Sequence, residues 1–172
     1  MTRVPRPEPT LGAAALLFSA GVLFGAALPA TATSIPPASV DERSAWFFFE
    51  RNATVAVVLY GGSLTFGVVT AVTLSYNGFA VGYAVAGGES VARSLLLLAP
   101  HAVVELPAFL LAGAAGLGLP AEVLRYLRGT QETLLRRSAV RRSVHRFLWA
   151  VALLGVAAWV EAVVTPAIAA AL

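Results

Sequence analysis

Runs of about twenty apolar residues, almost free of charged side chains, constrain this chain more than any other feature. One run, residues 95–120, reads LLLLAPHAVVELPAFLLAGAAGLGLP. A helix needs about 20 mostly apolar residues to cross a bilayer. Soluble domains carry about 25% charged residues, whereas this chain has 12% charged and 58% hydrophobic residues. The sequence therefore predicts an all-α fold, a polytopic membrane helical bundle that forms one domain over residues 1–172.

The apolar runs predict about five membrane spans. They cover residues 11–29, 54–73, 72–88, 94–119 and 147–170. Tyr76-Asn77-Gly78 has the composition of a turn, so the segment 72–88 is expected to be a short or broken span. Pro100 removes a helical hydrogen bond, and the span over 94–119 is therefore expected to be kinked.

The charged residues between the spans predict the orientation in the membrane. Residues 121–146 are amphipathic and arginine-rich, which indicates one or two surface helices near anionic headgroups. Short cytoplasmic loops collect positive charge, so this segment and the N-terminus are expected in the cytoplasm. Residues 31–51 then form an extracytoplasmic loop, and the C-terminus lies outside. Because topology accounts for the basic residues, we expect a multi-pass protein of the cell membrane and no nucleic-acid partner.

The first apolar run leaves an alternative open. Ala30-Thr31-Ala32 fits the pattern of a signal-peptide cleavage site, although a run near 20 residues exceeds the usual apolar region of a signal peptide. The run also holds Gly21 and Gly25, a GxxxG pair that favours close helix contact. Gly78 with Gly82 gives the same spacing further along, and Gly116 continues a stripe of small residues.

Three ionisable side chains lie well inside the predicted spans: His101, Glu105 and Glu161. Charged groups at mid-membrane cost about 2.5–3.5 kcal/mol on insertion scales and usually face protein or a wet cavity. His101 and Glu105 are four residues apart and share a helix face. Glu161 is expected at a similar depth, so Glu161 or Asn77 is the candidate to complete a polar cluster.

The prolines beside the pair are expected to make the segment locally polar. Pro107 has no N–H and leaves the carbonyl of Val103 without its helical donor. Pro100 releases another backbone carbonyl in the same way. Both carbonyls are candidates to satisfy His101 and Glu105.

The residues argue against catalysis. A histidine and a glutamate four residues apart supply two metal ligands, and His145 lies on the expected cytoplasmic segment. No metal site or cofactor is therefore expected. No motif places a serine beside His101 as a nucleophile, and the absence of cysteine excludes thiolate chemistry. The chain is not expected to be an enzyme, which leaves a buried cluster that fixes helix assembly or a relay for protons or ions.

The segments NATVAVVLYGGSLTFGVVTAVTLSYNGFAVGYAVAGG and PHAVVELPAFLLAGAAGLGL together resemble the stage II sporulation protein M family of integral membrane proteins. The resemblance covers roughly residues 50–120 and 147–168. It is carried by Asn52, Gly67, Asn77, Gly78, Gly82, Pro100, His101, Glu105, Ala112, Gly113, Gly116, Glu161, Thr165 and Pro166. At Ala102 the chain departs from the glycine that often follows the histidine in the family.

The resemblance implies a non-catalytic scaffold or assembly protein. The family's namesake looks like a membrane scaffold that recruits peptidoglycan-remodelling proteins during engulfment. For this chain it implies a protein that recruits unknown protein partners at the lipid bilayer. We further expect such a scaffold to form a homo-oligomer. The alternative is a transporter or channel subunit that uses the His/Glu cluster as a proton or ion relay.

Overall fold

The computed structural model describes residues 9–28, 44–88 and 90–169 of the chain. Within these ranges the chain is almost entirely helical and contains no strand, which confirms the predicted all-α membrane bundle. The elements are α1 (Pro9–Ala27), α2 (Ala45–Gly61), the short 3₁₀ helix η2 (Gly62–Thr65), α3 (Val68–Gly87), α4 (Val91–Leu127) and α5 (Arg137–Ala169).

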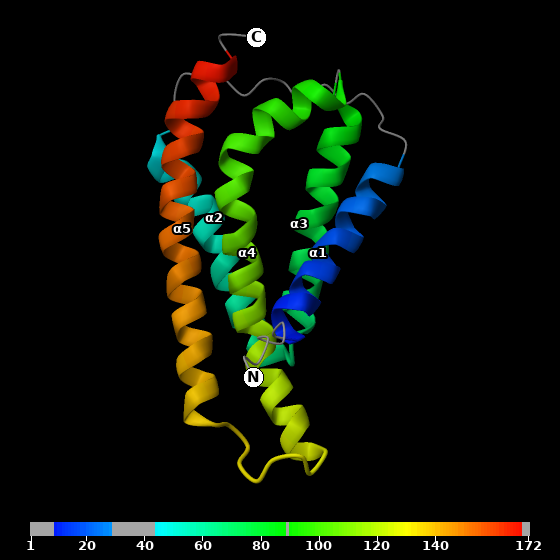
Figure 1. Cartoon of the computed structure of the whole chain (residues 1–172), viewed down its shortest axis with the longest axis vertical. Helices are drawn as coiled ribbons and strands as arrows, with labels where there is room; N and C mark the ends of the chain where they lie inside the picture. The colour runs from blue at the N-terminus through cyan, green and yellow to red at the C-terminus, as the bar shows by residue number, and fades with distance from the viewer. Residues whose placement is uncertain (1–8, 29–43, 89, 170–172) are drawn as a thin grey trace, which may run out of the picture.

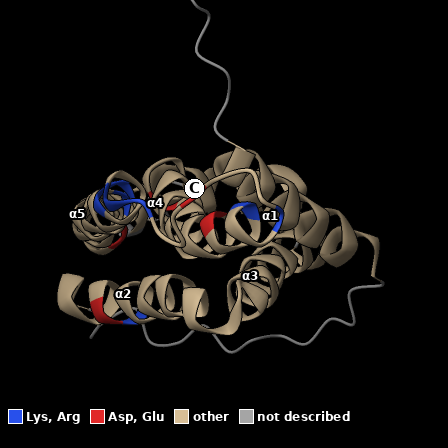
Figure 2. Ribbon diagram, turned by 90° about the horizontal axis from the view of Figure 1, so that it is seen from below, with Lys and Arg blue, Asp and Glu red and all other residues tan. Residues whose placement is uncertain are grey.

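The five long helices run up and down along one axis. Consecutive helices alternate in direction, so α1, α3 and α5 run one way and α2 and α4 the other (Figure 1). Seen end-on, α5, α4 and α1 lie in one row, and α2 and α3 lie in a second row beside it (Figure 2). The start of α1 and the end of α5 therefore lie at opposite ends of the bundle (Figure 1).

Four helices of the described part are long and apolar enough to cross a membrane. They are α1, α3, residues 98–127 of α4 and residues 137–165 of α5. Between α1 and α3, α2 has 17 residues and carries Glu50 and Arg51. Large apolar side chains point outward, as Leu16 on α1 does with 73% of its surface exposed. Such an outer surface suits lipid rather than water.

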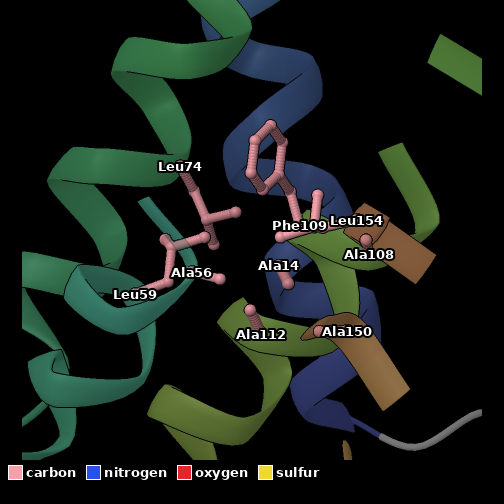
Figure 3. Packing of buried hydrophobic residues seen from close by; sticks show 9 residues of the cluster. All are labelled: Ala14, Ala56, Leu59, Leu74, Ala108, Phe109, Ala112, Ala150 and Leu154. Carbon is pink, nitrogen blue, oxygen red and sulfur yellow. The ribbon is translucent and has the colours of Figure 1, made fainter. Parts of the chain in front are cut away.

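Small residues dominate the centre of the bundle. The buried cluster draws on all five long helices and consists of Ala14, Ala56, Leu59, Leu74, Ala108, Phe109, Ala112, Ala150 and Leu154 (Figure 3). In a membrane the lipid tails are as apolar as leucine, so helices associate through close van der Waals contact. The alanines allow that contact, and the larger side chains fill the space between the helices.

The helices begin and end at residues suited to those positions. Ser44 and Ser90 precede α2 and α4, where their Oγ atoms accept hydrogen bonds from backbone N–H groups three residues on. Gly129 follows α4 with φ of 69°, and its N–H donates to the carbonyl of Tyr126. This left-handed residue ends the helix in the way glycine commonly does.

The predicted span over residues 54–73 is wrong. The chain turns back at residues 62–67, between α2 and α3, instead of continuing as one helix. Phe66 and Gly67 have φ of 52° and 86°, and the Gly67 N–H donates to the Gly62 carbonyl at 2.9 Å. The apolar run concealed this reversal, because the turn sequence GSLTFG contains no charged residue to interrupt the run.

The predicted turn at Tyr76-Asn77-Gly78 is also wrong. These residues lie inside α3, which is one continuous helix of 20 residues and not a short or broken segment at 72–88. Asn77 donates from Nδ2 to the Thr73 carbonyl of its own helix at 2.8 Å. Gly78 lies against the backbone of Phe18 on α1. The glycine therefore serves close helix contact and not chain reversal.

The segments expected between spans are largely extensions of helices. In the 121–146 stretch, α4 continues to Leu127, and α5 begins at Arg137, before the expected start at residue 147. Only the part between those two residues is a loop, so separate surface helices do not form. Of the expected 31–51 loop, residues from Ala45 onward belong to α2. Residues 31–43 of that loop and the Ala30-Thr31-Ala32 pattern lie outside the described residues.

The bends of α4 agree with its prolines. Pro100, Pro107 and Pro120 all lie within this 37-residue helix. Its first turns cross one end of the bundle, and the helix then turns to run beside α5 (Figure 1). The kink expected in this span is thus present in a helix longer than the predicted 94–119 segment.

Candidate functional site

Helices α4 and α5 bring together the three ionisable residues identified in the apolar runs. One ligand atom each of His101, Glu105 and Glu161 lies within 4.8 Å of the other two, and all three side chains are half-buried. His101 and Glu105 face the same side of α4 because they are one turn apart. The antiparallel course of α5 places Glu161 opposite them.

The three side chains line a cavity of about 540 Å³ within the bundle. Helices α2 and α3 form its other walls and contribute Arg51, Asn52 and Asn77 among the lining residues. Tyr76 on α3 and Arg51 on α2 line the cavity and are also exposed. The cavity therefore opens between these two helices. Phe109, which is buried, also lines the cavity.

Asn77 and Asn52 add amide groups to this cavity. The Asn77 side chain donates one hydrogen bond from Nδ2 to the Thr73 carbonyl at 2.8 Å, and its amide oxygen and second N–H remain as polar groups. Asn52 on α2 is buried and lines the same cavity. The structure thus brings Asn77 and Glu161 to the same cavity as the His101–Glu105 pair.

Arg51 was not predicted as a site residue. Its position in a polar stretch indicated an extracytoplasmic loop, whereas it lies on α2 at the cavity opening. The sequence did contain a sign of this position, because Arg51 and the apolar residues that follow it belong to the same unbroken helix, α2. Recognising α2 as starting near Ser44 would have placed Arg51 within the bundle.

The carbonyls released by the prolines do not complete the cluster. Val103 and Pro107 are exposed and neither lines the cavity, because they lie on another face of α4. The Nδ1 atom of His101 is buried and has no hydrogen-bond partner among the described residues. A buried polar atom without a partner costs free energy, so this nitrogen is available for a ligand.

Glycines set the helix positions around the cavity. A Cβ atom at Gly78 would overlap the Phe18 carbonyl of α1, and one at Gly82 would overlap the Val22 carbonyl. Gly21 and Gly25 on α1 approach the α3 backbone in return. Such contacts require residues without side chains. They hold α1 directly against α3, the helix that carries Asn77.

Two further glycines fit α4 against its neighbours. Gly113 lies against the side chain of Leu74, and Gly116 lies against the carbonyl of Leu59 and the hydroxyl of Thr70. The same Thr70 hydroxyl donates to the Leu59 carbonyl at 2.8 Å. These contacts fix α4 beside the α2–α3 reversal and so set the position of His101 and Glu105 further along α4.

A second polar cluster lies at the other end of α4 and was not anticipated. Glu122 is 2% exposed and pairs with Arg125 and with Arg136, whose Nε and Nη2 donate at 2.7 and 2.8 Å. The hydrogen bond from Arg136 to Glu122 raises the arginine pKa above its usual value. Gln131 donates to the Glu122 carbonyl at 2.8 Å. The cluster ties the α4–α5 loop to the last turns of α4.

Comparison with known proteins now places the chain in a family. The family model described as stage II sporulation protein M matches residues 14–166, nearly all of the described structure. The chain belongs to the stage II sporulation protein M family. This match confirms the resemblance seen in the sequence, and the matched range includes His101, Glu105 and Glu161.

One relative of this family member comes from an archaeon. An uncharacterized protein of Methanocaldococcus jannaschii is 31% identical over 123 residues, which cover 69% of each chain. No solved structure matches the chain. The family match and this relative establish that the chain is a member of the family.

Proposed function

We propose that this protein is a membrane subunit that passes protons or other cations through the cavity formed by α2, α3, α4 and α5. The observation that carries the proposal is the meeting of His101, Glu105 and Glu161 within 4.8 Å inside a membrane bundle. Ionisable side chains in such bundles commonly mark ion pathways. Passing an ion requires binding and release but no catalysed reaction, so we propose that the protein is not an enzyme.

Electrostatics supports a cation as the cargo. Two carboxylates close together in a poorly polarisable environment repel each other, and a proton or cation between them relieves that repulsion. His101 adds a group that accepts and releases protons near neutral pH in other proteins. Arg51 on α2 is the arginine among the residues that line the cavity. It supplies balance when the cavity holds no mobile cation.

A flux measurement in proteoliposomes tests this proposal. The purified protein is reconstituted with a pH-sensitive dye inside the vesicles, and a pH or cation gradient is imposed. The wild type is expected to dissipate the gradient, and Glu105→Gln is expected to reduce the rate at least tenfold. Glu50→Gln is the matched control, because Glu50 is an exposed carboxylate on α2 outside the cavity. A wild-type rate equal to that of empty vesicles would refute the relay.

A second candidate function is the non-catalytic scaffold that recruits protein partners and forms a homo-oligomer. It is favoured by the basic end of the bundle, where Arg136 and Gln131 of the α4–α5 loop donate hydrogen bonds to Glu122. Arg137 and Arg141 are exposed beside that loop and offer a defined surface to an acidic partner. With the N-terminus and this end in the cytoplasm, the partner would be cytoplasmic.

The two candidates respond differently to the same variants. Glu105→Gln leaves a scaffold's assembly intact but stops a relay. Replacing Arg137 and Arg141 with glutamine weakens a scaffold's capture of partners in cross-linked membranes and leaves flux unchanged. Oligomer mass in nanodiscs, measured by mass photometry, tests self-association separately. One outcome would support both functions. In it, Glu105→Gln loses flux but keeps partner capture, and the Arg137 and Arg141 variant loses partner capture but keeps flux, so that each function lies at a different end of the bundle.

A further inference from the structure

We infer that His101, Glu105 and Glu161 bind one divalent transition metal ion of the first row. The inference rests on the proposed cation-binding function of the cavity and names the ion class. The sequence pointed to Glu161 only as a member of a polar cluster, and the fold brings this carboxylate from α5 close enough to act as a third ligand beside the H-x-x-x-E pair. An imidazole and two carboxylates are a set that binds Zn²⁺, Fe²⁺ or Mn²⁺ in proteins.

The geometry is close to that of a metal site. Ligand atoms around a four-coordinate zinc ion are roughly 3.4 Å apart, given metal–ligand distances of about 2.0–2.2 Å. The three candidate atoms lie within 4.8 Å of one another. Small side-chain rotations therefore close the set around an ion, with no movement of the helices.

The buried nitrogen of His101 is an independent sign of a missing partner. Its Nδ1 atom is buried without a hydrogen bond among the described residues. Ligand histidines bind the metal through one nitrogen as the neutral ring. A metal ion in the cavity gives this imidazole a partner that no described protein group supplies.

Charge and the remaining cavity wall favour a divalent ion. Two carboxylates and one divalent cation sum to zero charge, which lowers the cost of burying the carboxylates in the membrane. Asn52 and Asn77 line the same cavity, and amide oxygens are acceptable further ligands for hard or borderline ions. The Arg51 guanidinium also lines the cavity, and a divalent ion still neutralises the two carboxylates that would ligate it.

Metal binding is measured directly on the purified full chain in nanodiscs, carrying an affinity tag without histidine. Equilibrium dialysis with Zn²⁺ and with Mn²⁺, followed by elemental analysis, is expected to give one ion per chain for at least one of them. Glu161→Gln and His101→Gln are each expected to weaken binding at least tenfold. His145→Gln and Glu50→Gln are the matched controls, since both residues are exposed and lie outside the cavity.

A spectroscopic readout keeps the test valid if a variant misfolds. Co²⁺ added to the wild type is expected to give visible absorption bands of a low-coordinate ion, which excess Zn²⁺ removes. Absence of stoichiometric binding by all three ions in the wild type would overturn the inference. So would undiminished affinity in a folded Glu105→Gln/Glu161→Gln double variant.

The outcomes separate this inference from the proposed relay. Proton flux that persists in chelator-treated protein, with no metal bound, overturns the metal site and leaves the relay standing. Stoichiometric metal binding without any flux supports the metal site and removes the relay, making the ion structural. Flux that requires the metal supports both.

Discussion

His101 on α4 and Glu161 on α5 lie on facing sides of one cavity, with ligand atoms within 4.8 Å of each other and of Glu105. Their helices run in opposite directions, and a loop of polar residues joins them at the far end. Glu161 thus joins the two side chains of α4, His101 and Glu105, in a three-residue cluster that links two helices. Every function argued for the cavity depends on it.

The contact between α1 and α3 predicts a strong effect of a single methyl group. Gly78→Ala is expected to lower the free energy of unfolding by about 1–3 kcal/mol, because the new Cβ overlaps the Phe18 carbonyl. Gly118→Ala is the matched control, since its Cβ would meet nothing within 4 Å. Thermal unfolding in detergent, followed by tryptophan fluorescence, compares the two. Equal midpoints for both variants would contradict the close contact.

The reversal between α2 and α3 predicts a second sensitive glycine. Gly67 has φ of 86°, a conformation that costs other residues about 1–2 kcal/mol. Gly67→Ala is therefore expected to lower the thermal midpoint. Gly61 is the last residue of α2, has a φ of −61°, and a Cβ atom there would meet nothing within 4 Å. Gly61→Ala is therefore expected to leave stability unchanged or to raise it. A midpoint unchanged by Gly67→Ala would argue for one continuous helix through this region.

The ion cluster at the end of α4 predicts that one buried carboxylate stabilises the loop. Glu122→Gln removes the charge that Arg125 and Arg136 share, and is expected to cost about 1–3 kcal/mol. Glu132→Gln changes an exposed carboxylate in the same loop and is expected to cost little. Protease sensitivity of the loop measures the difference. Equal cleavage rates of the two variants would show that the pairing contributes nothing.

The sequence predicted the fold class because apolar runs report directly on the solvent around a helix. It failed at residues 62–67, where Gly62 and Gly67 reverse the chain within an apolar stretch. Glycine serves both turns and close helix contacts, and hydropathy does not separate the two uses. Gly67 was thus placed inside a span. Gly78 was assigned both to a turn and to a close helix contact, of which only the contact is present.

The cavity residues were identifiable because ionisable side chains are scarce in spans. His101, Glu105 and Glu161 were recognisable among apolar neighbours. Counting residues along the predicted spans placed Glu161 at a membrane depth similar to that of His101. Arg51 and Glu122 did not stand out, because each lies beside other charged residues in the sequence. Their burial or cavity position depends on where α2 begins and α4 ends, which the apolar pattern does not specify.

The meeting of α4 and α5 at the cavity is tested most directly by cross-linking, since the chain has no cysteine. A protease site placed in the loop at residues 128–136 separates the two helices on a gel unless a link joins them. His101→Cys with Glu161→Cys is predicted to remain joined after treatment with a short dithiol-specific reagent, whereas exposed Val103→Cys with Glu161→Cys is predicted to separate. Separation of the first pair, with linkage of the second, would contradict the structure of the cavity.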